Sequence, residues 1–226
     1  MDDPALDAEE HRRALIGLSR INQWTGVAAA MYRRLRKLSV LSPRPLRVLD
    51  IATGAGDLPL TWIKFAKRDN LPLHVSAIDI SSVAIASAVQ QGERLGLDVE
   101  WMVGNALEET LPNDYDVVTT SLFLHHLEDD DIVRLLRIMR EATDRGGEVR
   151  SLLICDLARS RFNLALVSLA ARLLSTSRVV HRDAALSVRA AMTRREFSLL
   201  AESALGVAPR VEPLHPCRFI AQIRVN

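Results

Sequence analysis

Short apolar runs alternate with amphipathic stretches along most of this chain. The amphipathic stretches have apolar residues at helical spacing and lie at residues 57–68, 82–95, 129–143, 162–175 and 193–204. The strand-like runs themselves lie at residues 46–52, 73–80, 99–103, 115–122, 149–157, 208–214 and 218–225. Such alternation indicates parallel strands with helices on both faces, but the last two runs are joined by a connection too short for a crossover helix. We therefore predict an α/β fold: a doubly wound, mostly parallel seven-stranded sheet with an antiparallel C-terminal edge hairpin, Rossmann-like in type.

Composition limits the classes of protein that this chain can be. Its 226 residues carry 29 basic and 28 acidic side chains, a balance that argues against a nucleic-acid-coating protein. Cys155 and Cys217 are 62 positions apart, without a CxxC pair or a Cys/His cluster, so we expect no metal site. The acidic N-terminus does not resemble a signal peptide, and no apolar run is long enough to cross a membrane. We expect a cytoplasmic protein.

The turn after the first strand has the composition of a ligand-binding loop. Gly54 and Gly56 allow a tight turn and a close backbone approach, although two glycines also make an ordinary strand–helix turn. Asp50 ends the first strand and Asp79 ends the second, where a carboxylate accepts the hydroxyls of a ribose. In open α/β sheets ligands bind beyond these strand ends. The pattern predicts a cofactor that contains adenosine.

The same turn argues against a dinucleotide. Pro59 stands where the dinucleotide fingerprint requires a third small residue for close helix packing. Asp50 and Asp57 would repel a pyrophosphate, whereas two carboxylates suit a sulfonium and an ammonium group.

Four consecutive segments resemble the motifs of class I S-adenosylmethionine-dependent methyltransferases. They are LDIATGAGD, HVSAIDIS, GNALEETLP and DYDVVTTSLFLHHL, in the order and spacing of that family. Two positions depart from the family pattern: Ala52 replaces a usual glycine and Asn105 a frequent aspartate. The resemblance implies S-adenosyl-L-methionine as cofactor, with S-adenosyl-L-homocysteine as product, and no metal. The cofactor-binding residues that it implies are Asp50, Ala52, Thr53, Gly54, Gly56, Asp79, Ile80, Asn105, Ala106 and Ser121.

Three histidines are candidates for a general base, which a neutral hydroxyl acceptor would need. His125 and His126 directly follow the fourth strand, where packing or a helix start would also explain them. His181 lies beside Arg182 and Asp183, a triplet that could equally be a solvated loop. We expect the acceptor to contact Trp24 and Phe123, with simple packing as the alternative for Trp24.

These features together predict methyl transfer to a small aromatic or hydrophobic acceptor, by O- or C-methylation. A nicotinamide-dependent oxidoreductase and a non-catalytic cofactor-binding regulator are the alternatives.

We expect one domain overall, with residues 1–42 as an N-terminal helical lid, 43–226 as the catalytic domain and a helical cover at about 158–195. The basic run at residues 32–37 could touch an anionic membrane, although such runs are usually solvated. The sequence does not fix the oligomeric state.

Overall fold

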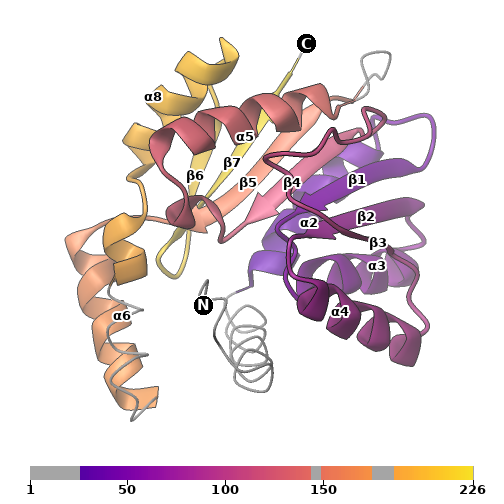
Figure 1. The fold of residues 1–226 in the computed structure, drawn as a ribbon, viewed down its shortest axis with the longest axis horizontal. Coiled ribbons are helices and arrows are strands. Elements are labelled where there is room, and N and C mark those ends of the chain that lie inside the picture. The colour runs from indigo at the N-terminus through magenta and orange to yellow at the C-terminus, as the bar shows by residue number, and fades with distance from the viewer. Residues whose placement is uncertain (1–25, 144–148, 175–185, 226) are drawn as a thin grey trace.

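A seven-stranded sheet forms the centre of the computed structural model, which describes residues 26–143, 149–174 and 186–225. The strand order is β3-β2-β1-β4-β5-β7-β6 (Figure 1). Strands β1 to β5 are parallel to one another, whereas β7 is antiparallel to both β5 and β6. The strand bounds are β1 (Leu46–Ile51), β2 (Leu73–Asp79), β3 (Glu100–Val103), β4 (Val117–Ser121), β5 (Ser151–Leu157), β6 (Arg210–Leu214) and β7 (Arg218–Arg224).

Helices cover both faces of the sheet (Figure 1). One face packs against α5 (Asp129–Glu141) and α8 (Arg194–Leu205). The other packs against α2 (Val27–Ser39) and α3 (Asp57–Asp69), with α4 (Ser82–Leu95) beside β2 and β3. The helix α6 (Arg161–Leu174) follows β5 and extends away from the sheet, and the short 3-10 helix η1 (Leu124–His126) follows β4.

The central position of β1 follows from its composition. The strand is buried almost throughout, as expected for a parallel strand with helices on both sides. Its register pairs Asp50 with Ala77 of β2 and with Thr119 of β4. The carboxyl ends of β1, β2 and β4 therefore meet at one edge, which positions the side chains that follow each strand.

The predicted fold class is confirmed, including the antiparallel edge hairpin. The strand and helix positions agree with the sequence pattern to within about two residues at most ends. Part of the predicted lid, residues 1–25, lies outside the described residues. Helix α2, which falls within the expected lid, packs in the core through Met31, Leu35 and Leu38. No helix in the described ranges is long and apolar enough to cross a membrane.

Candidate active site

The turn after β1 relies on left-handed backbone conformations. Ala52, Gly54 and Gly56 all have positive φ angles, of 56°, 59° and 75°. A Cβ atom added to Gly54 would face open space, so this position leaves the backbone accessible. A Cβ atom added to Gly56 would lie 2.3 Å from the ring of Trp101, so packing alone demands a glycine there. The positive φ of Ala52 favours glycine, which explains why the methyltransferase family that the motifs resemble usually has a glycine at this position.

Asp50 is a buried carboxylate that is bonded to hydroxyl groups. Its side chain accepts hydrogen bonds from Thr119 Oγ1 at 2.6 Å and from Thr53 Oγ1 at 2.8 Å. Only 1% of the residue is exposed, and no lysine, arginine or histidine among the described residues pairs with it. Burial raises the pKa of Asp50 to about 7; the two hydroxyl bonds lower it and the charge of Asp79 raises it further. Among the described residues, Asp50 therefore has no protein cation beside it to balance its charge when the carboxyl group is ionised.

Asp79 ends β2 and faces the same turn. Its Oδ2 atom accepts a hydrogen bond from Gly54 N at 2.7 Å, and its Oδ1 atom accepts one from Ser81 N at 2.9 Å. Each carboxylate oxygen has a second lone pair, so the group can still accept bonds from a ligand. Ile80, which follows it, is 69% exposed, and Val103 at the end of β3 is 55% exposed. These two side chains offer an apolar surface next to Asp79.

The loop after β3 uses its polar atoms within the turn itself. The side-chain oxygen of Asn105 accepts a bond from Leu107 N at 3.1 Å, so it stabilises the turn. The backbone N–H of Asn105 donates to the Glu109 carboxylate. Ala106 is buried in the hydrophobic core, with 8% exposed. The cofactor-binding roles predicted for Asn105 and Ala106 stay predictions.

The end of β4 carries small polar residues and then a tight turn. Thr120 donates to the Ile51 carbonyl at 3.0 Å, which ties β4 to β1 at this end. Ser121 is the last strand residue and is partly exposed. The next residue, Leu122, has a positive φ of 54°, and Phe123 packs against the core on the α5 face. This turn directs the chain into η1.

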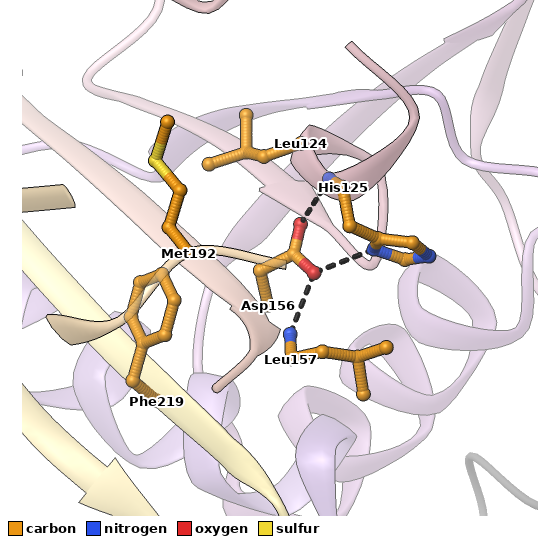
Figure 2. A pocket seen from close by; sticks show the side chains of 6 residues that line it. All are labelled: Leu124, His125, Asp156, Leu157, Met192 and Phe219. Carbon is orange, nitrogen blue, oxygen red and sulfur yellow. Dashed lines mark hydrogen bonds and ion pairs between the residues drawn. The ribbon is translucent and has the colours of Figure 1, made fainter. Parts of the chain in front are cut away.

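His125 and Asp156 form a hydrogen-bonded pair between η1 and the end of β5. The Nδ1 atom of His125 lies 2.7 Å from Asp156 Oδ1, and both side chains are almost fully buried. Asp156 also accepts bonds from the backbone N–H groups of His125 and Leu157. Figure 2 shows the ring turned so that its second nitrogen points away from Asp156. An ionised carboxylate can only accept, so Nδ1 donates and a neutral ring keeps the Nε2 lone pair for another proton.

The pair lies against a small apolar pocket. Leu124, Leu157, Met192 and Phe219 line this pocket together with His125 and Asp156 (Figure 2). Met192 comes from the segment before α8, and Phe219 from β7. The apolar surroundings strengthen the interaction between the carboxylate and the imidazole by excluding water.

The other predicted catalytic and acceptor residues have different outcomes. His126 is exposed and stacks on His125, with ring centroids 4.2 Å apart. His181 and Trp24 lie outside the described residues. Asp156 is a site residue that the sequence pattern does not single out. Its only signal is a lone carboxylate at the end of an otherwise apolar strand, a pattern that also fits a surface position.

The strand ends fit a ligand that combines a cation, a ribose and an apolar ring. The uncompensated charge of Asp50 suits a cationic group, and Asp79 suits a pair of hydroxyls. Ile80 and Val103 suit the face of a planar ring. Among the described residues, no group of three or more His, Cys, Asp or Glu side chains could hold a metal ion.

A seven-stranded sheet of this order, with a glycine turn and a carboxylate at adjacent strand ends, defines a Rossmann-like α/β fold. Within that class, residues 48–147 match the family model described as "Methyltransferase domain". This part of the chain is therefore similar to methyltransferase domains, in agreement with the resemblance of its motifs to the class I, S-adenosylmethionine-dependent type. A search with the sequence matches no curated protein.

Solved structures confirm the fold at low sequence identity. Human N-acetylserotonin methyltransferase superposes with a TM-score of 0.70 at 16% identity, covering 97% of this chain and 57% of the human one. A SAM-dependent methyltransferase from Aquifex aeolicus gives 0.65 at 17% identity, covering 98% and 100%. An O-methyltransferase from neocarzinostatin biosynthesis gives 0.68 at 19% identity, covering 97% and 59%. The chain thus spans less than two thirds of the length of the human enzyme and of the neocarzinostatin enzyme.

Proposed function

We propose that this protein transfers a methyl group from S-adenosylmethionine to a hydroxyl group of a small aromatic acceptor. The observation that carries the proposal is the buried pair of His125 and Asp156, at the strand edge that also holds the cofactor-type residues. A phenolic hydroxyl must lose its proton when its oxygen accepts a methyl group. A histidine oriented by a carboxylate is suited to take that proton near neutral pH.

The cofactor would lie over the ends of β1, β2 and β3. Asp79 would accept the ribose hydroxyls, and Ile80 with Val103 would flank the adenine. Asp50 would place negative charge near the cationic end, while Gly54 leaves room for the backbone to approach. When bound, the cofactor supplies an activated methyl group on a sulfonium. These roles agree with the spare lone pairs, exposure and charge of each group.

On the acceptor side, the protein would accept one proton from the hydroxyl group of the acceptor. The acceptor O–H would donate to His125 Nε2, which takes the proton as the oxygen–methyl bond forms and the sulfur–methyl bond breaks. Asp156 then stabilises the resulting imidazolium through its 2.7 Å contact with Nδ1. Leu124 and Leu157 keep water from the pair. The remaining task is alignment of the two reactants.

Two of the similar structures support an aromatic hydroxyl acceptor. The neocarzinostatin enzyme is an O-methyltransferase whose structure holds 2-hydroxy-5-methyl naphthoic acid. A second structure of it holds S-adenosylhomocysteine and 1,4-dihydroxy-2-naphthoic acid. The sequence identity to this enzyme is only 19%, so we use its acceptor only to choose the test compounds.

The test compares two neighbouring histidines in the same 3-10 helix. Methyl transfer from labelled S-adenosylmethionine to a panel of naphthols and hydroxynaphthoates would be measured for wild type, His125→Ala and His126→Ala. We expect His125→Ala to lower kcat by about 10²–10⁴-fold, the usual contribution of a general base. His126→Ala serves as the matched control and should keep most of the rate.

Binding of S-adenosylhomocysteine, measured by calorimetry, should be unchanged in both variants. Equal rates in the two variants would refute the role of His125. Cofactor binding without transfer to any compound of the panel would instead favour the non-catalytic regulator.

A further inference from the structure

A groove of about 570 Å³ opens at the same edge of the sheet, beyond the pair of His125 and Asp156. Three parts of the chain enclose it: the connection from β5 to α6, the start of α8, and the β6–β7 hairpin. Its lining residues are Ala158, Arg159, Ser160, Asn163, Thr193, Arg194, Arg195, Pro213, Leu214, His215, Cys217 and Arg218. We call this surface the arginine groove.

The arginine groove carries an excess of positive charge. Four arginines line it, and no aspartate or glutamate is among its lining residues. Arg159 pairs with Glu196, whose other oxygen accepts from Thr193 N. Arg194, Arg195 and Arg218 have no ion pair within the described part of the chain. Three guanidinium groups of the groove therefore lack a paired carboxylate among the described residues.

Arg218 is the least accessible of these cations. Only 8% of the residue is exposed, and its Nε atom is buried without a hydrogen-bond partner among the described residues. Its Nη1 atom donates to the Pro216 carbonyl at 3.1 Å. Burial lowers its pKa, an effect that the nearby Cys155, Cys217 and Asp156 partly oppose. A buried guanidinium without a carboxylate paired to it costs free energy, and the Nε atom, unpartnered among the described residues, indicates a ligand that would supply an acceptor.

The start of α8 adds to the positive potential. Arg194 and Arg195 are the first two residues of the helix, where the helix dipole favours acidic side chains. Thr193 and Glu196 form a capping box, which satisfies two backbone donors but leaves the two arginines unbalanced. A helix start combined with exposed guanidinium groups is a favourable place for an anion.

We propose that the arginine groove binds the phosphate or pyrophosphate group of a small soluble molecule. Three such cations are better neutralised by a group with several negative charges than by a single carboxylate. Leu157, Met192 and Phe219, which line the small apolar pocket beside His125, are each adjacent in sequence to a residue of the arginine groove. The bound group would therefore lie next to that pocket. This proposal goes beyond the proposed methyl transfer and does not depend on it.

The experiment is a calorimetric titration of the full chain with inorganic pyrophosphate, with benzoate as a single-charge comparison. The test variant is Arg194→Gln/Arg195→Gln, which removes two exposed groove charges. The matched control is Arg137→Gln/Arg224→Gln, which removes two exposed charges from α5 and the far end of β7. Both variants change the net charge by the same amount, so a general electrostatic effect would appear in both.

We expect saturable binding of pyrophosphate by wild type and by the control variant, and binding about tenfold weaker or worse in the groove variant. Benzoate should bind more weakly than pyrophosphate to all three proteins. The same affinity in the two variants would overturn the proposal, as would the absence of saturable binding to wild type. Cosedimentation with phosphatidylglycerol vesicles, without binding of soluble pyrophosphate, would also overturn it, because the anion would then belong to a membrane.

A second variant tests the buried cation. Arg218→Lys keeps the charge but loses the planar fork that can form two parallel bonds to one phosphate. We expect weaker pyrophosphate binding in this variant, with folding checked by thermal unfolding. Because the readout is anion binding, failure of this proposal and failure of the proposed methyl transfer are separate results.

Discussion

Two buried carboxylates at the carboxyl edge of the sheet have different partners. Asp50, at the end of β1, is 1% exposed and accepts bonds from two threonine hydroxyls. Asp156, at the end of β5, is 2% exposed and accepts bonds from an imidazole and two backbone N–H groups. The two carboxylates are buried to nearly the same extent, so their different hydrogen-bond donors determine what each group can do.

Asp50 has no cationic partner among the described residues, whereas Asp156 is hydrogen-bonded to His125. Hydroxyl donors leave Asp50 without a balancing cation, so burial raises its pKa to about 7. Asp156 instead fixes the orientation of His125 and leaves the second ring nitrogen for proton transfer. We expect substitutions at Asp156 to act on the rate of reaction, and substitutions near Asp50 to act on cofactor affinity and stability.

The largest expected effect follows from Asp156→Asn. An amide in place of the carboxylate has one acceptor atom for three N–H donors, and it can stabilise the wrong tautomer of His125. We expect kcat to fall by about 10²–10⁴-fold, measured by methyl transfer to a hydroxynaphthoate. Affinity for S-adenosylhomocysteine should stay within about twofold, since the side chain of Asp156 bonds to His125 and to Leu157 N and not to Asp50, Gly54 or Asp79.

Two controls make this result specific. Circular dichroism would show whether the variant folds. The double variant Asp156→Asn/His125→Ala should be no slower than His125→Ala alone, because both changes remove the same proton-transfer unit. Additive losses would mean that Asp156 acts apart from His125.

The difference between the two carboxylates also explains what can be predicted from the sequence. Asp50 and Asp79 lie at the ends of two neighbouring parallel strands, and Gly54 lies in the turn after the first of them. Because such strand ends share an edge, the proximity of these residues follows from the order of the strands alone. The 2.7 Å contact between Gly54 N and Asp79 is of this kind. The fold is predictable for the same reason, because it follows from the alternation of strands and helices.

The residues around His125, where we propose that the acceptor binds, can be predicted from the sequence only in part. His125 is one of three candidate bases, and choosing it requires knowing that Asp156, 31 residues later, faces it. The arginine groove combines residues from three separate connections, and no local pattern links Arg159, Arg194 and Arg218. Position after a strand is also a weak guide to the orientation of a side chain, since Ala106 follows β3 and is buried in the core.

The second prediction concerns the pH dependence of stability through Asp50. Its pKa is about 7 in the folded protein and near 3.9 in an unfolded chain, so the folded state holds the proton more tightly. The free energy of unfolding should therefore fall as pH rises from about 4 to 7 and level off above that. Asp50→Asn removes this titration.

We expect the stability of wild type to fall relative to Asp50→Asn by about 3 kcal/mol between pH 4.5 and 8. Urea unfolding of the two proteins at both pH values, without cofactor, measures the difference. A constant difference across this range would show that Asp50 is ionised throughout. In that case, the charge at this edge is already compensated within the protein.

The smallest expected effect is the loss of cofactor affinity in Asp79→Ala. If Asp79 accepts the ribose hydroxyls, its removal should weaken binding of S-adenosylhomocysteine by about 1–3 kcal/mol, as for hydrogen bonds to a charged group. Asp79 also accepts bonds from Gly54 N and Ser81 N, so part of this loss would come from a looser glycine turn. Asp79→Asn helps to separate the two, because its amide keeps one acceptor for the turn.

Calorimetry with S-adenosylhomocysteine would be compared for both variants and for Asp98→Ala, which removes an exposed carboxylate from the connection between α4 and β3. The Asp98 variant should bind as wild type does. An unchanged affinity in Asp79→Ala would refute the ribose assignment. Asp50 would then be the sole acidic contact proposed for the cofactor.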